Sequence, residues 1–168
     1  DTTQSDCPMM AEPSKEHHWL QRFVGELTVD GECMMGPDQP PMKTTGRCVT
    51  RSIGGLWTLG EGTGEMPGGG EATSAFTLGY DPAKGKFVGT FVASMMTHLW
   101  LYEGSLDASG KVLTLDAVGP SMAGNGSMAK YQDIVTVESD DHWVLSSQIE
   151  GPDGTWTKFM SAHYRRKA

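Results

Sequence analysis

The chain has 168 residues, a length that accommodates one domain with a hydrophobic core but not two. Its formal net charge of −8 argues against nucleic acid and anionic membrane surfaces as partners. With 22 glycines and 38% hydrophobic residues, the composition is typical of a turn-rich globular protein rather than a disordered one.

Membrane insertion is not expected, because no stretch reaches the roughly 18 apolar residues of a membrane-spanning helix. No signal peptide is recognisable, and the chain begins at Asp1 without a methionine. The sequence therefore favours the cytoplasm and leaves a periplasmic or secreted mature form open.

The three cysteines, Cys7, Cys33 and Cys48, show no CxxC spacing, so a zinc ribbon is not expected. Two interpretations remain for Cys33 and Cys48. Cys33 and Cys48 either form a bridge between neighbouring strands or are buried free thiols, and the second is favoured.

Residues 1–14 are polar and contain Pro8 and Pro13, so we expect a flexible lead-in followed by a single barrel domain over residues 15–168. A short helix is predicted from Lys15 to about Phe23.

This predicted helix has Ser14 as its N-cap. Because His17 stands where a capping box needs Glu or Gln, no such box is expected, and His17 and His18 are predicted to lie at the surface. Trp19, Leu20 and Phe23 form an apolar face that needs burial.

From Gly25 onward the chain contains only strand patterns, rich in β-branched and aromatic residues and separated by Gly, Pro, Asp and Ser. The predicted strands cover residues 26–34, 43–53, 56–64, 72–80, 86–95, 98–106, 111–118, 127–138, 143–150 and 155–164. Strands joined in sequence by turns predict an all-β fold, a roughly ten-stranded antiparallel up-and-down barrel with the N-terminal helix plugging one end.

Every second connection in this meander is a tight turn, and the turns must all lie at one end of the barrel, together with the helix. The other end receives the longer connections and is expected to be open. Eight of the 11 methionines fall in or beside these longer connections, which predicts a methionine-rich mouth. They are Met34, Met35, Met42, Met66, Met95, Met96, Met122 and Met128.

The segment Met95-Met96-Thr97-His98 holds two thioethers and an imidazole within four residues, so we expect function near it. On the strand that follows, His98, Trp100 and Tyr102 share one face, while Leu99, Leu101 and Glu103 share the other. Inward-pointing aromatic rings would suit a flat ligand. The alternative buries Glu103, which would then need Arg47 or Arg51 as its partner.

The candidate ligand-binding residues are Met34, Met35, Met66, Phe91, Met95, Met96, His98, Trp100 and Tyr102. His98 and Glu65 are candidate metal ligands, because thioether and imidazole suit Cu(I), while imidazole and carboxylate suit zinc or iron. No GxSxG, HExxH or phosphate-binding loop is present, so no catalytic residue is assigned.

Two terminal segments resemble the calycins, the group of lipocalins and fatty-acid-binding proteins. The segment from His18 to Gly31 is similar to their opening helix and first strand, with Leu27 where their tryptophan is expected. The ending His163-Tyr164-Arg165-Arg166-Lys167 resembles their final strand, whose basic residue packs across strand one.

The motifs WLQRFVGE, MMGPDQPPMK, LGYDPAKGKFVGTF, YEGSLDASGKVLTL and AHYRRK resemble a bacterial domain-of-unknown-function family, number fifteen seventy-nine. This resemblance implies a lipocalin-like barrel and little chemistry.

Nitrobindins are related haem-binding barrels with a histidine on the last strand. Here Phe159, Met160 and Ser161 occupy that neighbourhood, and the nearby His163 is displaced. Because a shift of one residue turns a side chain to the other face of a strand, haem is not expected.

Two hypotheses follow. The first is a binding module that holds a small apolar or aromatic molecule through the methionine-rich mouth. The second is a metal-dependent enzyme that uses copper, zinc or iron, with His98 and Glu or Met side chains of the mouth as ligands. A homodimer is left open.

Overall fold

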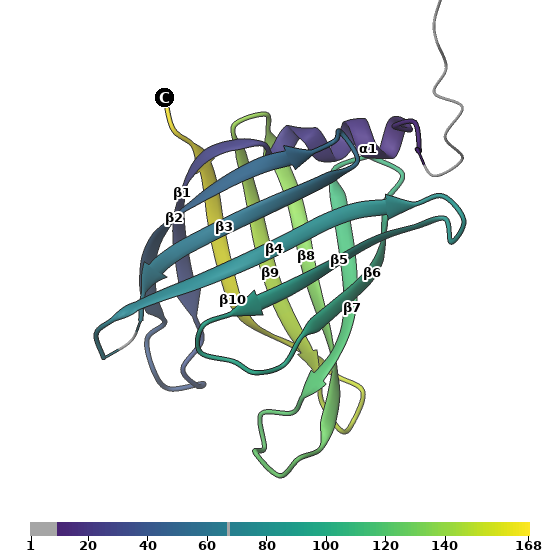
Figure 1. Ribbon diagram of the computed structural model, residues 1–168. Helices are drawn as coiled ribbons and strands as arrows, with labels where there is room; N and C mark the ends of the chain where they lie inside the picture. The colour runs from purple at the N-terminus through teal and green to yellow at the C-terminus, as the bar shows by residue number, and fades with distance from the viewer. Residues whose placement is uncertain (1–9, 67) are drawn as a thin grey trace, which may run out of the picture.

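A computed structural model of the protein describes residues 10–66 and 68–168. Ten antiparallel strands form a closed barrel in which each strand pairs with its neighbours in sequence and β1 pairs with β10 (Figure 1). The strands are β1 (Gly25–Cys33), β2 (Met42–Ile53), β3 (Trp57–Glu65), β4 (Glu71–Asp81), β5 (Lys86–Ala93), β6 (Trp100–Leu106), β7 (Val112–Pro120), β8 (Met128–Ser139), β9 (His142–Glu150) and β10 (Trp156–Arg166). The predicted fold class is confirmed.

The helix α1 (Lys15–Leu20) and the 3-10 turn η1 (Gln21–Phe23) lie across one end of the barrel, which we call the capped end (Figure 1). Figure 1 also shows the tight strand connections at the capped end and the longer ones at the opposite, loop end, as the connection lengths predicted. Leu20 is fully buried and Phe23 is 6% exposed. The apolar face of the helix therefore closes the barrel.

A capping box holds α1 in place, although none was predicted. The Ser14 N–H donates to His17 Nδ1 at 2.9 Å. Because Nδ1 accepts this bond, Nε2 carries the ring proton and donates to the Tyr80 carbonyl at 2.9 Å. His17 is only 4% exposed, so its predicted surface position was wrong, whereas His18 is exposed as expected. A histidine thus takes the place of the Glu or Gln that usually completes a capping box, and it also ties the helix to β4.

The packed core is concentrated at the capped end. It consists of apolar side chains from the cap and from the strand ends that meet it. Its members include Leu20, Phe23, Leu27, Leu78, Phe87, Leu113, Leu115, Val135, Val137 and Trp143. Aromatic rings link the cap to this core, since Phe23 packs edge-on against Trp143 with centroids 5.0 Å apart.

The C-terminal strand also closes the capped end, as the calycin resemblance implied. Arg166 donates from Nη1 to the Val24 carbonyl and from Nη2 to the Arg22 carbonyl, the latter at 2.7 Å. Its guanidinium lies 5.8 Å from the ring of Trp143. Gly25 has no side chain that would collide with this guanidinium. Arg166 therefore joins the last strand of the barrel to the segment just before the first strand.

The bridge between Cys33 and Cys48 does not form, and both are free thiols. In the pairing of β1 with β2, Cys33 lies opposite Met42, whereas Cys48 lies opposite Leu27. Six strand positions separate them, about 20 Å at the usual rise per residue. A disulfide needs Cα atoms within about 7 Å, so the expected free thiols are confirmed, although both side chains are half-buried rather than buried. Cys7 lies outside the described residues.

The lead-in expected over residues 1–14 lies mostly outside the described residues, of which only 10–14 precede α1. Within the described part of the chain, no helix has the length and apolar character to cross a membrane.

Candidate functional site

The interior of the barrel contains a cavity of about 820 Å³. It extends from Phe23 at the capped end to Met66, Met95 and Met122 at the loop end. A cavity of this volume is in the range of those that hold drug-sized ligands. The barrel is therefore not filled by its own side chains.

Small residues on β3 and β4 form one wall of this cavity, which we call the small-residue wall. On β3, the inward positions alternate along the strand and are occupied by Gly60, Gly62 and Gly64. The neighbouring strand β4, which pairs with β3, contributes Ala72 and Ser74. A Cβ atom on Gly62 would stand 2.8 Å from the Ser74 hydroxyl, so a larger residue would not fit there without displacement. This small-residue wall leaves the space that forms the cavity.

Aromatic side chains from β4, β5, β6 and β8 form another part of the cavity lining. We call them the aromatic wall, and they are Phe76, Phe91, Trp100, Tyr102 and Tyr131. Phe76 stacks on Tyr102 with centroids 5.3 Å apart and planes at 19°. Trp100 meets Tyr131 edge-on at 4.9 Å. The wall offers ring faces and edges to a flat ligand.

Strand β6 turns Trp100 and Tyr102 inward, the first of the two orientations considered from the sequence. Leu101 on the opposite face is 61% exposed. Glu103 also lies outside, where its carboxylate meets Lys84 Nζ at 2.7 Å. A buried Glu103 paired with Arg47 or Arg51 is therefore wrong.

Trp100 lies against Gly119 of β7, where a side chain would collide with its ring. Its indole Nε1–H is buried without a hydrogen-bond partner within the described part of the protein. An unsatisfied buried donor costs about 1–3 kcal/mol, so packing of the ring must offset that cost.

A half-buried carboxylate interrupts the aromatic wall. Asp133 on β8 accepts hydrogen bonds from the Tyr102 hydroxyl at 2.5 Å and from the Ser147 hydroxyl at 2.6 Å. Burial raises the pKa of Asp133 above its ordinary value, although both hydrogen bonds act in the opposite direction. Burial and the neighbouring Asp133 charge also raise the pKa of Tyr102, which therefore stays protonated as the donor.

The sequence contained a signal for Asp133 that its analysis missed. The inward positions of β8 are occupied by Tyr131, Asp133, Val135 and Val137. A carboxylate in an otherwise apolar or aromatic inward row is unusual, because isolated buried charges are costly. Tyr131, Ser147 and Phe76 were also missed, since no local motif marks them.

His98 precedes β6 and belongs to the loop 94–99, whereas it was expected to begin the strand. Its Nε2 lies 3.0 Å from the Val118 carbonyl, which can only accept, so Nε2 carries the proton. The ring packs edge-on against Trp100 at 4.8 Å. His98 therefore supports the aromatic wall at the loop end and has Nδ1 as its remaining acceptor.

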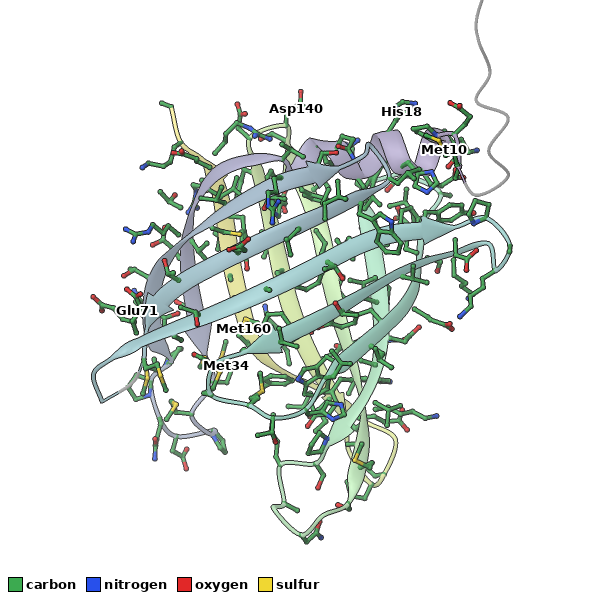
Figure 2. The ribbon with its side chains drawn as sticks, in the orientation of Figure 1. Met10, His18, Met34, Glu71, Asp140 and Met160 are labelled. Carbon is green, nitrogen blue, oxygen red and sulfur yellow. The ribbon has the colours of Figure 1, made fainter. Side chains whose placement is uncertain are left out.

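The methionines predicted at the mouth divide into two groups. Met66, Met95, Met96 and Met122 line the cavity at the loop end. Met34, Met35, Met42 and Met128 are not among its lining residues. Met34 and Met35 are 40% and 45% exposed, and Figure 2 shows Met34 near the end of β1.

The candidate metal ligands Glu65 and His98 both contribute to the loop end of the cavity lining. Within residues 10–66 and 68–168, no three His, Cys, Asp or Glu side chains converge as a metal-binding group. A metal centre at His98 remains a prediction that would need thioether or ligand-supplied donors.

The histidine considered for haem points away from the cavity. His163 stacks on His142 with centroids 5.1 Å apart, and their ring nitrogens lie 2.8 Å apart. Neither residue lines the cavity, whereas the adjacent Tyr164 does. The last strand therefore presents a phenol to the interior.

A closed up-and-down barrel with a capped end and an interior cavity defines a calycin-like protein. The chain belongs to the family described as "Protein of unknown function (DUF1579)", whose model matches residues 12–166. A comparison with curated proteins found no match.

Solved structures show the same fold. Rv2717c from M. tuberculosis superposes with a TM-score of 0.66 at 13% identity, covering 94% of this chain and 100% of that one. The S-type phycobiliprotein lyase CPES from Guillardia theta gives a TM-score of 0.60 at 10% identity, covering 94% of each chain. At these identities the likeness concerns the fold alone.

Proposed function

We propose that the protein binds a small, largely apolar and aromatic molecule inside the barrel. The molecule enters between the loops at the end of the barrel opposite α1. The observation that carries this proposal is the cavity of about 820 Å³ between the small-residue wall and the aromatic wall. Empty apolar space of this size sacrifices packing contacts, so a ligand that fills it gains them.

The methionines at the loop end support this entry route. Met66, Met95, Met96 and Met122 are unbranched and adaptable, so their side chains can move aside for an apolar molecule and pack against it afterwards. Met34 and Met35 are exposed near the same end and extend the apolar rim.

Titration with N-phenyl-1-naphthylamine, a neutral dye that fluoresces in apolar surroundings, tests the proposal. We expect saturable binding to the wild-type protein. Ala72→Trp fills the cavity from the inner face of β4 and should weaken dye binding at least about tenfold, because the indole occupies the ligand's space. Fluorescence titration gives both dissociation constants.

The matched control is Thr73→Trp, because Thr73 is exposed on the outer face of the same strand and does not line the cavity. This variant should bind the dye like the wild type. Equal weakening in both variants, or no saturable binding to the wild type, would contradict the proposal.

A further inference from the structure

The most unusual group in the cavity is the Asp133 carboxylate. It lines the cavity halfway along β8, and Leu115 of β7 and Ser147 of β9 are its register neighbours. Each oxygen accepts one hydrogen bond, from Tyr102 to Oδ2 and from Ser147 to Oδ1. A carboxylate has about four acceptor sites, so about two remain for a molecule in the cavity.

Among the residues that the structure describes, no positive side chain inside the barrel balances this carboxylate. Within the described part of the chain, Arg47 and His98 are the basic residues that contribute to the cavity lining. Arg47 is exposed, since its side chain alternates to the outer face of β2. His98 bonds the Val118 carbonyl at the loop end. The ion pairs of Asp30, Glu61, Glu103 and Asp141 all lie at the surface.

Aromatic rings line the same cavity as the carboxylate, and one of them, Tyr102, contacts it directly. Tyr102, which donates to Asp133, stacks on Phe76, and Phe76 packs against Phe91 at 5.8 Å. Tyr131, two residues before Asp133 on the same inward face, packs against Trp100. Ring faces attract cations, and a carboxylate accepts hydrogen bonds from them, so the two together suit an organic ammonium group.

We infer that the ligand is a flat aromatic molecule that carries a protonated nitrogen, and that its N–H groups bind the free acceptor sites of Asp133. The inference rests on the proposed function and specifies the ligand class of the same cavity. A cation there would form a charge-assisted hydrogen bond, which is stronger than a neutral one. The protein's net charge of −8 would also favour the approach of cations over anions.

A matched pair of competitors tests the inference. Naphthalene-2-carboxamidine is a cation, and naphthalene-2-carboxamide is its neutral counterpart with nearly the same shape. Each is titrated against the complex of wild-type protein with N-phenyl-1-naphthylamine. We expect the amidine to displace the dye at a concentration at least about tenfold lower than the amide, because hydrogen bonds to charged groups discriminate by this much.

Asp133→Asn should abolish this preference, so that the amidine and the amide displace the dye from this variant at similar concentrations. Asp116→Asn is the control, since Asp116 lies on the exposed face of β7 and bonds Gln132. It should keep the full preference for the amidine.

The outcomes separate the two proposals. Failure of the dye to bind the wild type would overturn the proposed function. Dye binding with equal displacement by amidine and amide, or a preference that survives in Asp133→Asn, would overturn the inference alone. Should Asp133→Asn not fold, the wild-type comparison still decides.

Discussion

Single residues decide how this barrel is closed and what its interior offers. At the capped end, His17 accepts from Ser14 and donates to Tyr80, so one imidazole joins the helix to a strand. In the cavity, Asp133 is held by Tyr102 and Ser147. Both are polar groups in apolar surroundings, and each has at least one partner distant in sequence.

Replacing His17 with Ala should lower the free energy of unfolding by about 1–3 kcal/mol, because the Ser14 N–H and the Tyr80 carbonyl lose their partner in a buried position. Urea unfolding followed by circular dichroism measures the change. His18→Ala alters the exposed neighbour and should change stability by less than about 0.5 kcal/mol. Similar losses in both variants would show that the imidazole bonds of His17 contribute nothing specific.

Asp133 should make stability depend on pH. Because burial raises its pKa above the ordinary value of 3.8, the folded protein keeps the proton where the unfolded chain has released it. Asp133 therefore makes the free energy of unfolding fall as the pH rises through that window and then level off. Asp133→Asn should lack the decrease in the free energy of unfolding that Asp133 causes. The stability of this variant relative to the wild type should therefore increase with pH.

Urea unfolding of both proteins at several pH values from 4 upward tests this expectation. Ser147→Ala removes a bond that lowers the pKa of Asp133, so the fall should become larger in that variant. Parallel pH profiles for the wild type and Asp133→Asn would refute the assignment.

At the scale of elements, β10 completes the barrel twice, by pairing with β1 and by carrying Arg166 to the cap. The register places Arg166 opposite Leu27, so its side chain reaches the carbonyls of Arg22 and Val24 just before β1. Leu27 stands where calycins were expected to have a tryptophan. Trp143 of β9 supplies the indole beside the guanidinium here.

Arg166→Ala should lower the free energy of unfolding by about 2–4 kcal/mol, because carbonyls at the capped end lose charge-assisted hydrogen bonds. Thermal and urea unfolding give the loss. Arg165→Ala removes an exposed ion pair with Asp30 and should cost at most about 1 kcal/mol. A smaller loss for Arg166→Ala than for Arg165→Ala would contradict the role of Arg166.

At the scale of the whole molecule, the packed core and the open part of the cavity are divided along the barrel axis. The cap and the tight turns lie at one end of the barrel (Figure 1). The packed core is concentrated at the same end, whereas the cavity extends toward the longer loops. Such a division lets the loop half give up packing contacts, because the capped half supplies the hydrophobic burial that folding requires.

The homodimer that the sequence analysis left open remains a prediction.

The sequence by itself determined the all-β class, the number of strands, their ends to within two residues and the position of the capped end. Alternation along each strand and the chemistry of each turn are local signals, so they can be recognised without knowing the neighbours.

Only the tertiary structure decided what lies inside. Tyr102, Asp133 and Ser147 are 31 and 14 residues apart along the chain, and they meet because of the strand register and barrel closure. The same non-local geometry buried His17, kept Cys33 and Cys48 apart and turned Glu103 outward. Contacts between distant strands depend on how the whole sheet closes, which no single segment encodes.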